Sequence, residues 1–206
     1  MLMTKAETTV AHILDAAEGL FLERNYADVT MDRIARSASV TKGALYHHFA
    51  GKEALYAGML RRDFAEKGGL FRHAAESTGT ARARLRRLTA AFFALPDRKR
   101  DLIRLVRRDL NAFPDSVRSE LVRAYQSALP EPVQRIVEDG IRSGELSPGD
   151  ARLLAWSFVA IVEVTMGPHA RRVFPDDDAR LDHVLNLFFS GAAGFQPSPT
   201  TPPTTE

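Results

Sequence analysis

The most informative segment of this 206-residue chain is 30-TMDRIARSASVTKGALYHHFAGK-52. Thr30 and Thr41 each precede a short run with helical spacing of apolar residues, and threonine side chains cap helix N-termini well. The predicted helices span 31–38 and 42–49, with a tight turn between them. Two helices that cross steeply need a small residue at their closest approach, and Ala35 fills that position. The segment therefore predicts a helix-turn-helix.

The outer side of the second predicted helix carries the residues that a DNA duplex would meet. Val40 and Leu45, together with Ile34 on the first predicted helix, are apolar anchors that turn inward. The residues left facing outward are Thr41, Lys42, Gly43, Ala44, Tyr46 and His47. Short side chains together with one lysine allow such a helix to enter the major groove closely.

Helical spacing of apolar residues continues along most of the chain. Two further stripes end at Pro96 and Pro114, and no segment shows the alternation of a strand. The residues 147-SPGD-150 resemble a helix start, with a cap followed by proline, and predict a helix over 148–167. The three aspartates 176–178 are expected to cap the last helix, over 178–195, because acids stabilise helix N-termini.

The predicted architecture is all-α, with about nine helices. A three-helix helix-turn-helix domain covers 1–51, a helical domain covers 52–195, and the Pro/Thr/Ser-rich tail 196–206 is expected to be disordered. Asn25 is expected to end the first helix in the left-handed conformation, which asparagine tolerates.

Charge and cysteine content narrow the function classes. The chain has no cysteine, which excludes disulfides, thiolate metal sites and cysteine nucleophiles. Its net charge is only +2, and residues 1–60 hold 6 lysines and arginines against 7 acids, whereas residues 61–112 hold 14 against 6. If the N-terminal part binds DNA, a few placed cations and helix N-termini must do so, because that part is not basic overall.

An enzyme is not expected. The sequence shows no helix with metal-ligand spacing, no glycine loop of the kind that cradles phosphates and no G-x-S-x-G motif. No cofactor and no metal site are predicted. A secretory signal is not evident, and the most apolar run, 153–166, is too short to span a bilayer, so we expect a cytoplasmic protein without membrane contact.

The stretch AAEGLFLERNYADVTMDRIARSASVTKGALYHHFAGKEAL, within residues 10–56, resembles the DNA-binding domain of the TetR (tetracycline repressor) family. The resemblance implies that Thr30 and Lys52 hold DNA phosphates, with Tyr46 and His47 pressing on the same backbone. It places Thr41, Lys42, Gly43 and Ala44 nearest the base edges. Ser39 stands where the family usually has a turn glycine, so the turn is expected to carry some strain.

The resemblance also implies a homodimer and a small-molecule effector. The helices 148–167 and 178–195 are expected to form the dimer seam, with Leu185 as one seam residue. We expect a ligand-responsive transcriptional regulator, a repressor that a small hydrophobic organic effector releases from double-stranded operator DNA. Activation is left open, and the alternative is a helical small-molecule binding or adaptor protein that does not act at a promoter.

Six residues are candidates for the effector site. They are aromatic residues and carboxylates on otherwise apolar helix faces: Phe92, Phe93, Asp109, Tyr125, Trp156 and Glu163. The four aromatic residues could equally be plain core. Glu163 interrupts an apolar helix, so it either hydrogen-bonds in a ligand cavity or lies paired at a dimer rim, because an unpaired buried carboxylate is costly. For Asp109, an exposed ion pair is the alternative.

Overall fold

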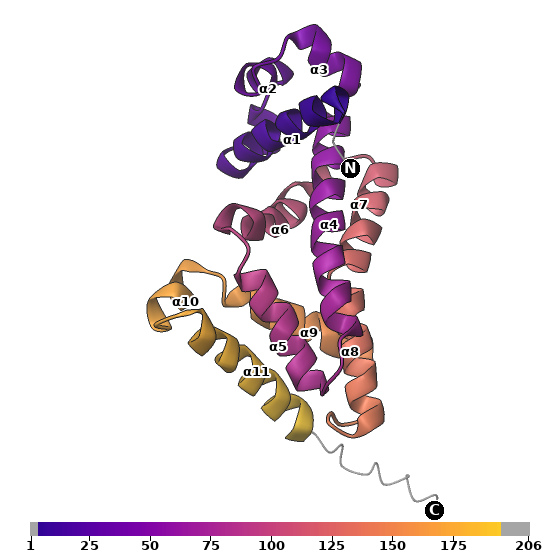
Figure 1. Cartoon of the computed structure of the whole chain (residues 1–206), viewed down its shortest axis with the longest axis vertical. Coiled ribbons are helices and arrows are strands. Elements are labelled where there is room, and N and C mark those ends of the chain that lie inside the picture. The colour runs from indigo at the N-terminus through magenta and orange to yellow at the C-terminus, as the bar shows by residue number, and fades with distance from the viewer. Residues whose placement is uncertain (1–3, 195–206) are drawn as a thin grey trace, which may run out of the picture. The chain divides into compact units, whose positions relative to one another are not determined.

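The computed structural model describes residues 4–194, and this part of the chain is all-α, as predicted (Figure 1). Its elements are α1 (Lys5–Glu23), η1 (Tyr26–Asp28), α2 (Met31–Ser37), α3 (Lys42–His48), α4 (Lys52–Glu76), α5 (Ala81–Phe93), α6 (Asp97–Asp109), η2 (Leu110–Ala112), α7 (Asp115–Ala128), α8 (Pro130–Ser143), α9 (Ala151–Val164), α10 (Pro168–Val173) and α11 (Asp177–Gly194). The predicted disordered tail, 196–206, lies outside the described residues.

The helices form two compact units. The first contains Met1–Leu70 and Ala91–Leu129, and the second contains Phe71–Ala90 and Pro130–Glu206. The helix-turn-helix segment lies entirely in the first unit. The domain boundary expected between residues 51 and 52 stays a prediction.

The first unit is built on α1 and an aromatic cluster. Helix α1 buries its predicted stripe, including Ile13, Ala17 and Phe21. The Phe21 ring meets the Tyr56 ring edge-on at 4.7 Å, and Tyr56 lies 5.1 Å from Phe113. Aromatic contacts of this kind stabilise a core beyond the area that they bury, so the cluster holds α1 and the residue that follows η2 (Leu110–Ala112) against α4.

The end of α1 differs from expectation. The helix stops at Glu23, and Asn25 has φ −66° and ψ 153°, so it is extended rather than left-handed. The chain therefore leaves α1 through an extended segment and a turn of 3-10 helix, and it needs no positive φ there.

Buried charges also join α1 to its neighbours in the first unit. The carboxylate of Glu18, on the buried face of α1, lies 2.9 Å from Nε of Arg98 and 3.1 Å from Nζ of Lys99. In α4, Lys67 donates to Asp63 one turn earlier at 2.5 Å, and both side chains are buried. Each buried charge thus has a partner, which burial in a low-dielectric interior requires.

The second unit contains a hairpin of α8 and α9. The intervening chain turns at Gly144, whose φ of 80° suits glycine. Helix α9 starts at Ala151, three residues later than the predicted start at 148, because Asp150 caps it by accepting from the Leu153 N–H at 2.8 Å. Asp150 is a good capping residue, and Gly149 in a first turn would cost backbone entropy, which explains the later start.

Helices α9 and α11 pack together in the second unit. The Phe158 and Phe188 rings meet edge-on at 5.1 Å, and Val184 and Leu185 are buried beside them. Helix α10, between these two, was not predicted. The helix predicted over 148–167 ends at Val164, and Pro168 is the first residue of a new short helix. Asp176 caps α11 as predicted by accepting from the Ala179 N–H at 2.7 Å, and Asp177 and Asp178 lie in the first turn of the helix.

None of the helices within residues 4–194 combines the length and apolar character needed to cross a membrane.

Candidate nucleic-acid interface

The helix-turn-helix forms as its caps predict. The Thr30 side chain accepts from the Arg33 N–H at 3.2 Å, and the Thr41 side chain accepts from the Ala44 N–H at 3.1 Å. Each hydroxyl oxygen thus satisfies one of the free donors at a helix start. Ile34 on α2 and Leu45 on α3 are buried, so the two helices pack through two of the three predicted anchors, whereas Val40 is half-buried.

The turn between the two helices carries the expected strain. Ser39 has φ 53°, and it is the one residue other than glycine with a positive φ among the described residues. The left-handed region is unfavourable for a residue with a Cβ atom. The hydrogen bond from the Val40 N–H to the Ala35 carbonyl at 3.0 Å holds this geometry in place.

Helix α3 turns the predicted contact residues outward. Tyr46 is 45% exposed, and the side chain of Lys42 is 60% exposed. Thr41, Gly43 and His47 are also exposed, and Ala44 is half-buried. This is the exposure that a helix entering a DNA groove requires, because its base-reading side chains must reach beyond the protein surface.

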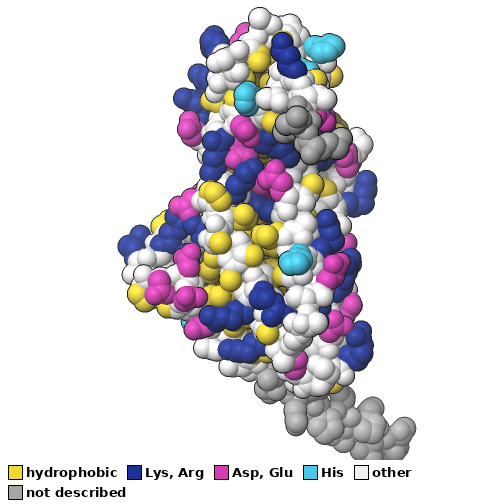
Figure 2. All heavy atoms as spheres, in the orientation of Figure 1, with side chains coloured by type: hydrophobic (Ala, Val, Ile, Leu, Met, Phe, Trp, Pro, Cys, Tyr) yellow, Lys and Arg dark blue, Asp and Glu magenta, His cyan; other side chains and the backbone are white. Residues whose placement is uncertain are grey.

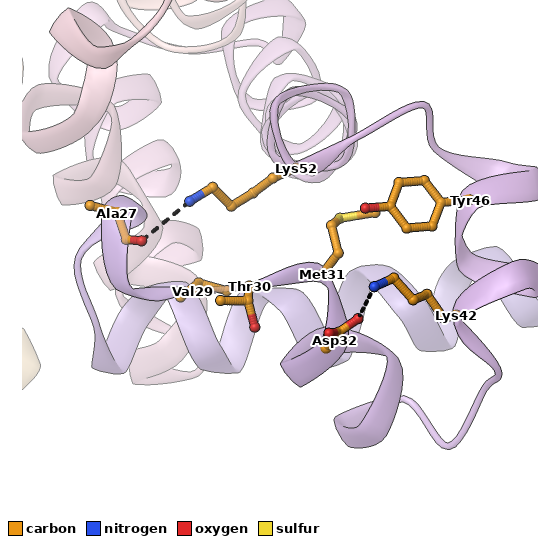
Figure 3. Close-up of a pocket in the computed structure, with 8 residues that line it drawn as sticks. All are labelled: Ala27, Val29, Thr30, Met31, Asp32, Lys42, Tyr46 and Lys52. Carbon is orange, nitrogen blue, oxygen red and sulfur yellow. Dashed lines mark hydrogen bonds and ion pairs between the residues drawn. The ribbon is translucent and has the colours of Figure 1, made fainter.

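A groove of about 310 Å³ lies beside α3 (Figure 3). Its lining residues come from the η1 turn, from the starts of α2 and α4 and from α3: Ala27, Val29, Thr30, Met31, Asp32, Lys42, Tyr46 and Lys52. The structure thus brings four predicted contact residues to one groove. Asp32 is an additional lining residue, and its only signal in the sequence was a place in a first helical turn, where acids are common.

Lys52 is held by the backbone of the η1 turn. Its Nζ donates to the Tyr26 carbonyl at 2.7 Å and to the Ala27 carbonyl at 3.4 Å, and it lies 4.3 Å from the centre of the Tyr26 ring. These partners are neutral, so the positive charge of Lys52 is not cancelled. Lys52 therefore ties the start of α4 to the groove and still presents a cation there.

Lys42 has a charged partner instead. Its Nζ lies 2.8 Å from Oδ1 of Asp32, and Figure 3 shows the two side chains turned toward each other across the gap between α3 and α2. The hydrogen bond between them lowers the pKa of Asp32 and raises the pKa of Lys42. Figure 2 likewise shows acidic side chains interspersed with basic ones over the visible face of α1, α2 and α3.

The six effector-site candidates fall in both units. Phe92, Phe93, Asp109 and Tyr125 are buried in the first unit, whereas Trp156 and Glu163 are half-buried in the second. Asp109 forms the ion pair that was its alternative role, with Arg108, but its side chain is only 6% exposed, so the expected exposure of the pair was wrong. The reason is that Tyr56 lies over it and donates to it.

A small bundle with an outward-facing second helix of a helix-turn-helix defines a class of DNA-binding proteins. The model of bacterial regulatory proteins of the tetR family matches residues 13–59, and the model of the tetracyclin repressor-like C-terminal domain matches residues 78–166. The chain therefore belongs to the TetR family of transcriptional regulators.

Three known proteins illustrate the similarity. The HTH-type transcriptional activator FasR of Mycolicibacterium smegmatis is 33% identical over 150 residues, which is 72% of this chain and 66% of FasR. The aligned region thus spans about two thirds of that relative. FadR from Bacillus subtilis, solved with stearoyl-CoA, gives a TM-score of 0.74 at 22% identity, covering 88% of this chain and 98% of FadR. AibR, solved with isovaleryl coenzyme A and operator DNA, gives 0.74 at 20% identity and the same coverage of 88% and 98%.

Proposed function

We propose that this chain is a cytoplasmic repressor that binds operator DNA as a homodimer and leaves it when a small hydrophobic effector binds. One observation carries the DNA-binding part of the proposal: α3 presents Lys42 and Tyr46 to solvent beside a groove that also holds Thr30 and Lys52. Lysine and the capping hydroxyl can both donate to phosphate oxygens, and α3 would enter the major groove.

The DNA-binding proposal is tested by removing contacts without disturbing the fold. Lys42→Ala and Tyr46→Phe should each weaken binding to an operator duplex severalfold in gel shift, with unchanged thermal unfolding, because both side chains are exposed. Arg135→Ala is the matched control, since it removes an exposed positive charge on α8 in the second unit. If both α3 variants bind the operator as tightly as the wild-type protein, Lys42 and Tyr46 do not contact the DNA.

The operator itself can be found with the wild-type protein and a pool of randomised DNA duplexes. A TetR-type dimer should enrich two half-sites separated by about one helical turn or a multiple, roughly 34–36 Å per turn. A pool that yields no enriched sequence would favour a helical binding or adaptor protein that does not act at a promoter.

An exposed stripe on α9 supports the homodimer. Leu153, Ser157, Ala160 and Val164 follow one another at helical spacing and are all exposed, and Leu187 on α11 is exposed as well. Leucine and valine in a contiguous exposed stripe are typical of a surface that another subunit covers. The α9 stripe and Leu187 lie on the two helices that are expected to form the seam, and a second copy of this chain is the proposed occupant.

For the effector, we propose an acyl-coenzyme A thioester, whose acyl chain is the hydrophobic part that the helical core would bind. Support comes from FadR and AibR, two structures of this fold at 22% and 20% identity that were solved with such ligands. A ligand that prefers the DNA-free geometry must weaken DNA binding by the same factor as DNA weakens its own binding. Stearoyl-CoA or isovaleryl-CoA should therefore raise the melting temperature of the free protein and release the operator, whereas coenzyme A without an acyl chain should do neither.

Glu163 gives a sharper test of the effector site. If Glu163 hydrogen-bonds in a ligand cavity, Glu163→Gln should alter effector-driven release more than it alters operator affinity. A response to effector identical to that of the wild-type protein would favour the position at the dimer rim.

A reporter gene fused to the target promoter tests whether the protein represses or activates transcription. We expect reporter expression to rise when the gene for this protein is deleted. A fall in expression would mean that the protein is an activator, as in the relative FasR.

A further inference from the structure

Asp32 is the one acidic residue that lines the groove beside α3. Its ion pair with Lys42 limits the positions and the charge that the lysine can offer to DNA. Asp32 lies in the first turn of α2, and Lys42 is the first residue of α3. Their side chains are 54% and 60% exposed, and Oδ1 of Asp32 is 2.8 Å from Nζ of Lys42. Both members of the pair are therefore open to solvent, and Figure 3 shows their side chains turned toward each other.

The hydrogen-bonding capacity of Lys42 is only partly used by this pair. An ammonium group has three N–H donors, and Asp32 accepts one of them. A lysine side chain otherwise moves freely on a flexible four-carbon stem, so an anchor at its tip lowers the entropy lost when it binds. Two donors remain for acceptors on a duplex.

The two lysines of the groove differ in charge balance. Lys52 is bound by neutral carbonyls and keeps its full charge, whereas Asp32 cancels the charge of Lys42. A phosphate approaching Lys42 would also be repelled by the carboxylate of Asp32. Guanine N7 and O6 are neutral acceptors on a base edge, so the same carboxylate opposes them far less.

We propose that Asp32 is a specificity-determining residue, which positions Lys42 for a base edge and keeps it from binding phosphates of any sequence. The two lysines then have different roles: Lys52 attracts the phosphates of the DNA backbone, and Lys42, positioned by Asp32, contacts a base edge and so contributes to sequence recognition. This inference rests on the proposed DNA-binding function. It goes further by assigning one residue, Asp32, the role of limiting binding to non-operator DNA.

The central variant is Asp32→Asn, which keeps the shape of the side chain and removes its charge. Binding should be measured for a duplex that the wild-type protein selects from a randomised pool and for a scrambled duplex, each at several KCl concentrations. We expect the scrambled duplex to bind about 3- to 10-fold tighter and the selected duplex to change less than about twofold, so discrimination falls. The slope of log K against log[KCl] for the scrambled duplex should steepen by about one, because Lys42 now neutralises a phosphate.

Two matched variants separate this role from general electrostatics. Glu23→Gln removes one exposed negative charge from the end of α1 and should leave the ratio of the two affinities unchanged. Asp32→Glu restores the charge and should restore most of the discrimination. If Glu23→Gln lowers discrimination as much as Asp32→Asn does, or if Asp32→Asn changes both affinities by the same factor, the inference is overturned.

A double variant tests whether Asp32 acts through Lys42. In a Lys42→Ala background, adding Asp32→Asn should leave the ratio of affinities unchanged, and a further fall would overturn the inference. Failure here is distinct from failure of the proposed function. If the wild-type protein selects no sequence, the proposed function falls and this inference with it; if it does select one and Asp32→Asn keeps full discrimination, only the role of Asp32 falls.

Discussion

Tyr56 of α4 donates its hydroxyl hydrogen to Oδ2 of Asp109 at 2.8 Å, and both side chains are buried. Arg108 donates to both oxygens of the same carboxylate, each at 2.8 Å, and its NH2 group also donates to the carbonyl of Phe21 at 2.9 Å. Burial, and then the hydrogen bond to Asp109, raise the pKa of Tyr56 well above its usual value. The end of α6 is thereby joined to α4 and to the end of α1 within the first unit.

Tyr56→Phe should lower the free energy of unfolding by about 1–3 kcal/mol, because it removes one donor from a buried carboxylate. Urea unfolding followed by circular dichroism measures the effect. Tyr46→Phe is the matched control, since it deletes the same hydroxyl from an exposed ring and should leave stability unchanged. Equal stability of the two variants would mean that the Tyr56 hydroxyl contributes nothing to the fold.

Lys67→Met should destabilise the protein by about 3–5 kcal/mol, because it leaves the buried carboxylate of Asp63 without its cation. Burial raises the pKa of Asp63 and lowers that of Lys67, so each group is costly to keep charged without the other. The double variant Asp63→Leu/Lys67→Met should recover most of the loss in thermal unfolding. A double variant less stable than Lys67→Met alone would contradict this account.

Leu187→Glu should give folded monomers, as light scattering would detect, because Leu187 is 52% exposed on the helix α11 that we place in the dimer seam. Leu185 is a poor choice for that test: it is only 1% exposed, so Leu185→Glu would bury a charge and unfold the second unit. Its assignment to the seam was wrong, since it packs in the core of its own unit. If Leu187→Glu still forms a dimer, the dimer interface lies on other residues.

Asp139 on α8 should make stability fall in acid. Its carboxylate accepts from Arg84 and from Arg142, each at 2.6 Å, and the Arg84 hydrogen bond is the main reason that its pKa is lowered. A lowered pKa in the folded state stabilises the protein above the unfolded value of about 3.9, and this contribution disappears as the pH falls through the folded value.

Asp139→Asn should therefore flatten the decline in unfolding free energy between about pH 4.5 and pH 2. Denaturant titrations at each pH measure it, with Glu23→Gln as the control for loss of one acidic group. Parallel curves for wild type and Asp139→Asn would show that these ion pairs are too well solvated to matter.

Features governed by neighbouring residues could be predicted well. The caps at Thr30 and Thr41 formed because a threonine hydroxyl reaches only the next few backbone N–H groups. The strained turn at Ser39 was expected from the resemblance to the TetR family, which usually has a glycine there, and the strain arises because a Cβ atom disfavours the left-handed region. The late start of α9 at Ala151 was missed because two capping residues, Ser147 and Asp150, competed within four positions.

Periodic apolar residues and local caps were thus enough to establish an all-α chain with a helix-turn-helix and an outward-facing α3. Which charges pair could not be inferred in the same way. Asp32 meets Lys42 because the consecutive helices α2 and α3 cross at a particular angle, and Tyr56 covers Asp109 because α4 packs against the end of α6, 53 residues later. Helical spacing specifies which face of a helix is apolar, but the partner of a polar side chain depends on which helix lies against that face.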